Sequence, residues 1–152
     1  MYHISVQRAV SGISIPAATD LKRWAKSALQ GKIPNAELTI RIVDKDEITT
    51  LNTTYRHKNK PTNVLSFPFE TPADVEIEVP LLGDIIICAE VIQEEARDQK
   101  KTLDAHWAHM VVHGTLHLLG YDHEKEDDAE KMEQEEIIIL KKLGFVNPYQ
   151  TV

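Results

Sequence analysis

The chain of 152 residues contains a single cysteine, Cys88, so it cannot form an internal disulfide. Cys88 ends the apolar run that begins at Ile85, which predicts a thiol packed in the core. The sequence also lacks a basic-then-apolar leader at its N-terminus and any apolar run long enough to cross a membrane. These absences exclude a disulfide-stapled scaffold, and we expect a cytoplasmic protein with no membrane partner.

Basic residues are outnumbered by acidic ones: the chain has 17 Lys and Arg residues and 24 Asp and Glu residues, for a formal net charge of −7. Such a balance argues against a nucleic-acid partner, since phosphate binding relies on basic surface. The charges are unevenly distributed, however. Residues 1–66 hold 10 basic and 5 acidic side chains, whereas residues 67–152 hold 7 and 19. The sequence therefore permits a basic face on an acidic protein.

The periodicity of apolar residues predicts an α+β fold. Short alternating or continuous apolar runs predict strands at residues 2–7, 38–42, 63–69 and 83–88. Helical spacing with start and stop signals predicts helices at residues 16–31, 45–55, 89–99, 102–119 and 127–143. The proline-bearing stretch 71–80 is expected to be a loop or a poor edge strand. We expect residues 1–152 to form one domain, with a mixed sheet of about four strands covered by helices.

Histidine is the residue type whose spacing is most informative, in the run from His113 to His123. His113 and His117 lie one helical turn apart on the same face and can chelate one ion. Gly120 can end the helix in the left-handed region, so that the chain returns and brings His123 to the same point. Three neutral nitrogen ligands suit zinc and leave a fourth position for water. We therefore predict one zinc ion per chain, with other divalent transition metals as possible occupants.

Two further histidines lie on nearly the same stripe of this helix. His109 and His113 are also four residues apart, so helix geometry alone permits that pair instead. The turn at Gly120 favours His117, because His123 should return near the last helical turn. His109 is then expected to lie behind the ligands or to face the substrate, and His106 to be packed or solvated.

The spacing His-x3-His-x2-Gly-x2-His is that of the metzincin peptidases, whose motif places a glutamate base directly after its first histidine. Here that position is Gly114, which has no proton-accepting group. Metal activation can furnish hydroxide near neutral pH without that base, and His109, Asp122 or Glu124 could relay the proton. The eight carboxylates between Glu124 and Glu136 are otherwise interpreted as a solvated helix face without chemistry.

A second segment joins a predicted helix end to a strand through a basic loop, from Tyr55-Arg56 to Pro61-Thr-Asn-Val-Leu-Ser-Phe-Pro68. With this segment, the histidine run and Gly83-Asp84-Ile85, nearly the whole chain resembles the YbeY family of bacterial rRNA maturation factors. Members are metal-dependent, single-strand-specific endoribonucleases. The resemblance implies that the three histidines of the run bind zinc and that Arg56 belongs to the catalytic cleft. The family usually has Asp where this chain has Asn63, which removes a carboxylate.

The resemblance thus implies a zinc-dependent endoribonuclease for small-subunit rRNA 3′ end maturation and ribosome quality control. Its implied partners are single-stranded rRNA, the ribosome and ribosome-assembly proteins. We expect zinc to lower the pKa of its bound water toward ~7 for attack on a phosphodiester, with Arg56 and His113 as catalytic residues. Arg56, Lys58, Lys60 and His109 are the predicted substrate-binding residues. Two alternatives stay open, namely a peptidase-like or other small-substrate zinc hydrolase and a non-catalytic ribosome-assembly factor with a structural metal.

Overall fold

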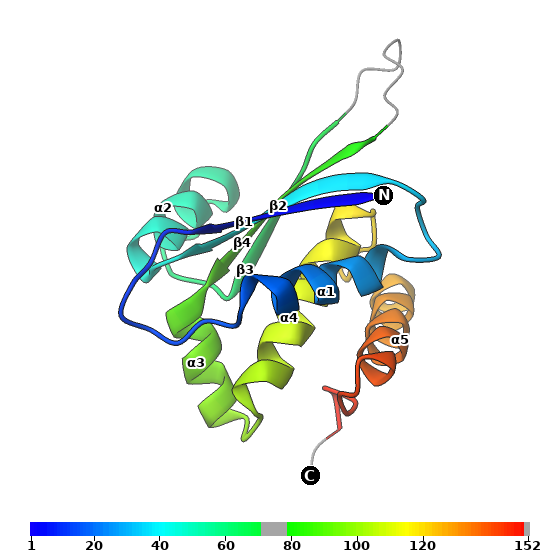
Figure 1. The fold of residues 1–152 in the computed structure, drawn as a ribbon. Helices are drawn as coiled ribbons and strands as arrows, with labels where there is room; N and C mark the ends of the chain where they lie inside the picture. Colours follow the sequence, from blue (N-terminus) through cyan, green and yellow to red (C-terminus); the bar gives the residue numbers. More distant parts are fainter. Residues whose placement is uncertain (71–78, 151–152) are drawn as a thin grey trace.

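The computed structural model describes residues 1–70 and 79–150 of the chain. Four strands and five helices lie within these ranges (Figure 1). Their order is β1 (Tyr2–Arg8), α1 (Ala18–Leu29), β2 (Ala36–Val43), α2 (Lys45–Arg56), β3 (Val64–Pro68), β4 (Leu81–Cys88), α3 (Ala89–Asp98), α4 (Leu103–Leu118) and α5 (Glu126–Lys142). Every predicted element is present, with bounds shifted by about two residues at most. The loop predicted at residues 71–80 lies, except for its last two residues, outside the described ranges.

The strands form one mixed sheet in the order β1-β2-β4-β3. β1 pairs with β2 and β2 with β4 in parallel, whereas β3 runs antiparallel to β4. The central strand β4 has its run Ile85 to Cys88 buried on both faces, which explains why this strand reads as continuous apolar sequence rather than as alternation. The α+β fold with a four-stranded mixed sheet is as predicted.

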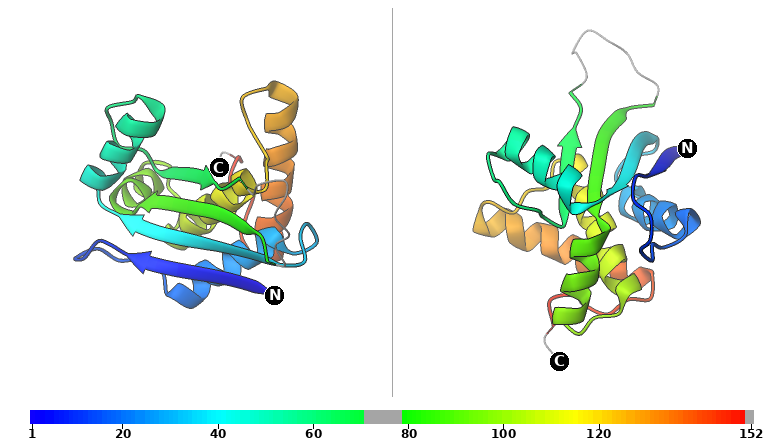
Figure 2. Two further views of the ribbon diagram at one scale, coloured as in Figure 1. Left: turned by 90° about the horizontal axis from the view of Figure 1, so that it is seen from above. Right: turned by 90° about the vertical axis from the view of Figure 1, so that its left-hand side faces the viewer.

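Helices cover the two faces of the sheet unequally (Figures 1 and 2). α1, α3 and α4 pack on one face, where residues such as Ile40, Ile85 and Ile87 of the sheet meet Trp24 and Trp107 in the main core. On the other face, α2 covers a smaller cluster that includes Cys88, which is fully buried as predicted. The larger core therefore lies on the face that carries the histidine helix.

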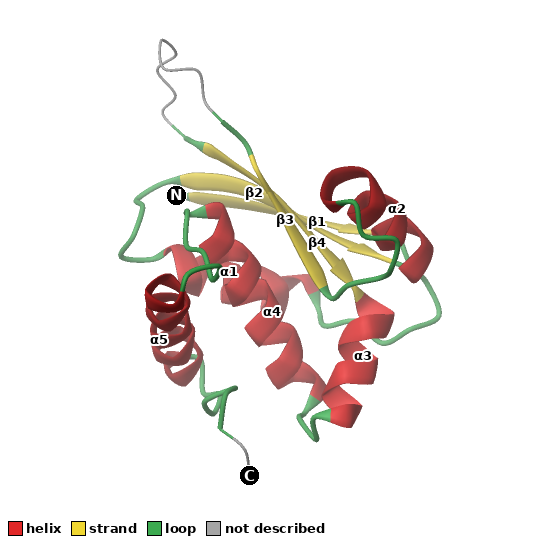
Figure 3. Ribbon diagram, turned by 180° about the vertical axis from the view of Figure 1, so that it is seen from behind, coloured by secondary structure: helices red, strands yellow, loops and turns green. Residues whose placement is uncertain are grey.

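α4 occupies the middle of this helical layer, with α3 on one side and α1 and α5 on the other (Figure 3). A helix surrounded in this way is expected to be apolar around most of its circumference, and its buried residues include Trp107, Val111 and Leu116. The histidines are exceptions that need polar partners. None of the described helices combines the length and apolar composition required of a membrane span.

Candidate metal centre

The three predicted ligands converge at the C-terminal end of α4. His113 and His117 lie on consecutive turns, and their Nε2 atoms are 3.1 Å apart. Gly120 has φ +102° and turns the chain back, so that one ring nitrogen each of His113, His117 and His123 lies within 4.8 Å of the other two. Two nitrogens bound tetrahedrally to one zinc ion are about 3.3 Å apart. The donor set therefore fits a single transition-metal ion with a free fourth position.

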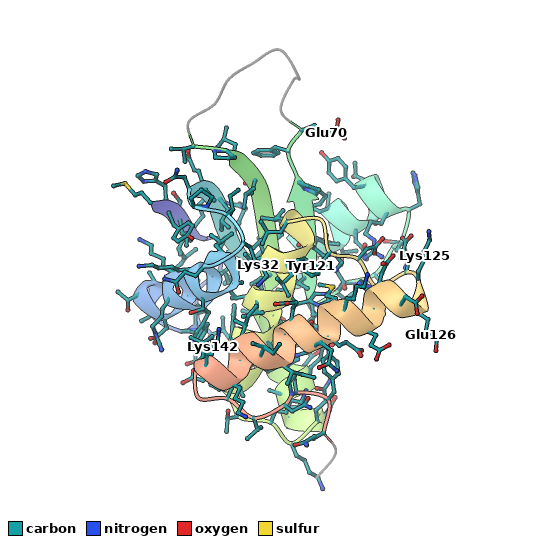
Figure 4. The ribbon with its side chains drawn as sticks, turned by 90° about the vertical axis from the view of Figure 1, so that its right-hand side faces the viewer. Lys32, Glu70, Tyr121, Lys125, Glu126 and Lys142 are labelled. Carbon is teal, nitrogen blue, oxygen red and sulfur yellow. The ribbon has the colours of Figure 1, made fainter. Side chains whose placement is uncertain are left out.

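The second nitrogen of His113 contacts a carboxylate for which the sequence predicted no chemical role. Nδ1 of His113 lies 3.2 Å from Oε2 of Glu136 on α5, and the Glu136 side chain is fully buried. Figure 4 shows that α5, from Glu126 to Lys142, runs across α4. A carboxylate that accepts from Nδ1–H leaves the Nε2 lone pair of His113 for a metal and holds the ring in place.

The expectation of a solvated acidic face is therefore wrong for Glu136, although most carboxylates of that stretch are exposed. A signal for its burial was present in the sequence. Glu136 follows Met132 by four residues and precedes Ile139 and Leu140 by three and four, and these three apolar residues form the buried stripe of α5. A carboxylate at a stripe position indicates a buried polar contact, which the simple count of charges in the stretch conceals.

His109 and Tyr149 complete the contacts of this carboxylate. Nε2 of His109 lies 3.0 Å from Oε1 of Glu136, and the Tyr149 hydroxyl donates to the same carboxylate. His109 is 6% exposed and lies behind the three predicted ligands. It does not line the groove that opens over them. His109, His113 and Glu136 also form a group that could hold a metal, but hydrogen bonds at these distances already satisfy the carboxylate.

Burial and neighbouring charges shift several pKa values at this centre. Burial, followed by the positive charges of His113 and His123, lowers the pKa of His117 to about 4, which keeps it neutral and able to bind a metal near pH 7. Burial also lowers the pKa of His109. For Glu136, burial alone would raise the pKa, but hydrogen bonds from His109 and His113 outweigh it and lower the pKa to about 2.

Gly114 occupies the position where a metzincin carries its glutamate base. At this residue α4 packs closely on the sheet, and the Ser66 hydroxyl donates to the Gly114 carbonyl oxygen at 3.1 Å. A Cβ atom at position 114 would lie 2.7 Å from Cγ2 of Ile85 and 3.4 Å from Cγ2 of Val64. A glutamate side chain cannot be accommodated there, so the absence of this base follows from the packing of α4 on β3 and β4.

A groove of about 900 Å³ opens over the three histidines. One wall consists of His113, His117 and the turn from Gly120 to Glu124, and the other consists of the end of α2 and of β3. Arg56, the last residue of α2, lines the second wall and is exposed. Lys58 and Lys60 lie outside the lining of this groove.

The loop after Arg56 is held by backbone contacts. His57 adopts the left-handed conformation with φ 58°, and its N–H donates to carbonyl oxygens at the end of α2. The buried side chain of Asn52 donates to the Lys60 carbonyl oxygen at 2.9 Å. The position of Arg56 at the rim of the groove is thus set by the end of the helix and by the pinned loop.

Asn63 stands where the family that the sequence resembles usually has Asp. Its side-chain amide donates to the Glu95 carboxylate at 3.2 Å. Nε2 of the buried His106 lies 2.9 Å from the same Glu95 carboxylate. The hydrogen bond to His106, with that of Asn63, lowers the pKa of Glu95 although burial opposes it. An aspartate at position 63 would place a second carboxylate against Glu95, so the neutral amide suits this environment.

Comparisons with known proteins agree with this fold. The family model described as "Endoribonuclease YbeY" matches residues 6–144 of the chain. The solution structure of TM1509 from Thermotoga maritima is similar with a TM-score of 0.59 and 24% sequence identity, over 99% of this chain and 99% of that chain. At this identity the likeness to TM1509 concerns the fold alone.

Proposed function

Because the chain belongs to the YbeY endoribonuclease family, and is therefore a hydrolase that acts on RNA, we propose that it cleaves single-stranded RNA in the groove over His113, His117 and His123. The family supports a nuclease role in rRNA maturation. The observation that supports the proposed site is the convergence of three imidazole nitrogens on one wall of a groove that carries Arg56 on the other.

Zinc is the metal that we propose for this site, in a family that depends on a metal ion. Three imidazole nitrogens with a free fourth position are typical of catalytic zinc. When bound, the ion supplies activation of a water molecule and positive charge beside the phosphate. Nickel, copper and iron accept the same ligands, so the donor set supports zinc without excluding them.

The side chains of the groove have separate roles in this proposal. Arg56 donates to the non-bridging phosphate oxygens and stabilises the charge that develops on them. The Asp122 carboxylate accepts from the backbone N–H groups of His123 and Glu124 at 2.7 and 3.3 Å, so it shapes the turn. Glu124 is also exposed on the groove, and we assign it as the carboxylate that accepts a proton from the attacking water. Lys58 and Lys60 would contact the RNA backbone beyond the groove.

The proposed biological substrate is the 3′ end region of small-subunit rRNA, with a further role in ribosome quality control. The ribosome and its assembly proteins are then the partners, and the cytoplasm is the site of action. These proposals rest on the family and on the basic residues at the end of α2 and in the loop that follows it, Arg56, Lys58 and Lys60, which suit an RNA backbone in an otherwise acidic chain. Gly114 argues against a peptidase, since it excludes the usual base.

The test compares cleavage of single-stranded and duplex RNA by zinc-loaded protein, chelated protein and the His117→Ala variant. His3→Ala is the matched control, because His3 is exposed on β1 and lies outside the groove lining. We expect cleavage of the single strand by the loaded wild type and by His3→Ala, with loss of both cleavage and bound metal in His117→Ala. A loaded, folded wild type that leaves RNA intact would contradict the proposal, and intact RNA together with ribosome binding would favour the assembly-factor alternative.

A further inference from the structure

Tyr55 is a large aromatic side chain that the fold leaves in solvent. It is the penultimate residue of α2 and is 63% exposed, whereas aromatic rings are mostly buried in protein cores. Its ring lines the same groove as Arg56 and the three histidines. Core packing does not account for a ring in this position, so its exposure indicates a contact outside the protein.

The ring is held in a defined orientation although it is exposed. Phe67 of β3, which also lines the groove, meets Tyr55 edge to face, with ring centroids 5.1 Å apart and an interplanar angle of 64°. Such an arrangement is favourable for two aromatic rings and restricts their movement. Tyr55 is therefore supported by a neighbour on the sheet while most of its surface stays open to the groove.

The cation next to this ring indicates the kind of ligand. Arg56 follows Tyr55 directly, and its guanidinium makes no salt bridge within residues 1–70 and 79–150. Proteins that bind single strands combine cationic side chains along the phosphates with aromatic rings on which bases stack. A ring and a guanidinium that are adjacent in one groove can contact the base and the phosphate of neighbouring nucleotides.

Building on the function proposed above, we propose that Tyr55, supported by Phe67, stacks on a nucleobase next to the phosphate held by Arg56. The stack makes Tyr55 a specificity-determining residue for single-stranded RNA. In a duplex each base is paired and stacked between its neighbours, so its face is closed to a side chain. A splayed single strand can present that face to Tyr55.

The test measures binding of the full chain to a labelled single-stranded oligoribonucleotide by fluorescence anisotropy, with chelator present so that the strand stays intact. Tyr55→Leu removes the ring, and Tyr55→Phe keeps it. Phe69→Leu is the matched control, because Phe69 is an aromatic residue that is 49% exposed outside the groove lining. We expect Tyr55→Leu to weaken binding roughly 5- to 100-fold, and Tyr55→Phe and Phe69→Leu to bind as the wild type does.

Two further measurements separate stacking from a general loss of affinity. Wild type and Tyr55→Leu should bind an abasic strand equally, and in the zinc-loaded enzyme Tyr55→Leu should raise KM for the single strand more than it lowers kcat. Wild-type binding that Tyr55→Leu leaves unchanged, or an equal loss on the abasic strand, would overturn this inference and leave the proposed nuclease intact. A wild type that neither binds nor cleaves single-stranded RNA would overturn both.

Discussion

The two walls of the groove hold their functional side chains in different ways. On the α4–α5 wall, His113 is fixed by the fully buried Glu136, which also accepts from His109 and Tyr149. On the α2–β3 wall, Tyr55 and Arg56 are exposed at the end of a helix. The metal wall is thus organised by buried hydrogen bonds, whereas the substrate wall is positioned by local backbone structure. Changes on the first should alter metal affinity and stability, and changes on the second should alter RNA binding and turnover while metal affinity stays the same.

The largest effect is expected on the substrate wall. Arg56→Ala should lower kcat for RNA cleavage by roughly 10²- to 10³-fold, because it removes donors to the charge that develops on the phosphate. Zinc content and thermal stability should remain those of the wild type, since Arg56 is exposed. Steady-state kinetics with parallel metal analysis check this. Arg97→Ala serves as the charge-matched control, because Arg97 is exposed at the end of α3 and does not line the groove. Unchanged cleavage by a folded, metal-loaded Arg56→Ala variant would contradict the electrostatic role of Arg56.

The next effect belongs to the metal wall. Glu136→Gln should weaken zinc binding by roughly 10- to 100-fold. His109 and His113 each contact a different oxygen of Glu136, and the amide replaces one of these acceptors with a donating NH2 group, so the contacts that hold the Nε2 lone pair of His113 toward the metal are disturbed. Competition with a chromogenic chelator measures the zinc Kd. Glu133→Gln, an exposed change on the same helix, should bind zinc as the wild type does. Equal zinc affinity in the two variants would show that the buried carboxylate does not organise the site.

A smaller effect tests the packing beneath the metal wall. An alanine in place of glycine inside a helix is ordinarily stabilising by about 0.5–1 kcal/mol. Gly114→Ala should instead lower the free energy of unfolding by about 1–3 kcal/mol, because the added methyl collides with the buried Ile85. Urea unfolding of the metal-free protein measures the sign of this change in the free energy of unfolding. In an Ile85→Ala background the same change should cost less, and a stabilised Gly114→Ala would contradict the close approach of α4 to the sheet.

The last effect is the response of the metal-free protein to acid. The folded pKa of His117, about 4, lies below its ordinary value of 6.5, so the unfolded chain takes up the proton first as pH falls. The free energy of unfolding should keep its full value above pH 6.5 and decrease between pH 6.5 and pH 4. It should decrease further between pH 4.5 and pH 2, as Glu136 is protonated. Denaturant titrations at a series of pH values measure it. His117→Ala should lessen the first decrease, whereas stability that rises on acidification would contradict the depressed pKa values.

Local patterns accounted for the helices and strands and for the convergence of the three histidines. The strands and the helices follow from the periodicity of apolar residues and from start and stop signals along the chain. The burial of Glu136 was predictable in principle from its place on the apolar stripe of α5, but its partner was not. His113 lies 23 residues away, and no local rule specifies which residue on a packed helix faces it.

The sequence by itself predicted that His113, His117 and His123 would converge, because the two helical histidines and the turn at Gly120 are related by the geometry of one helix and its end. Only the tertiary structure decided what surrounds them. It set the buried carboxylate behind His113, required glycine at position 114, and brought the end of α2 across the groove from the histidines. These relations join segments far apart in the chain, so they depend on how helices pack on a sheet and not on the spacing of residues along any one of them.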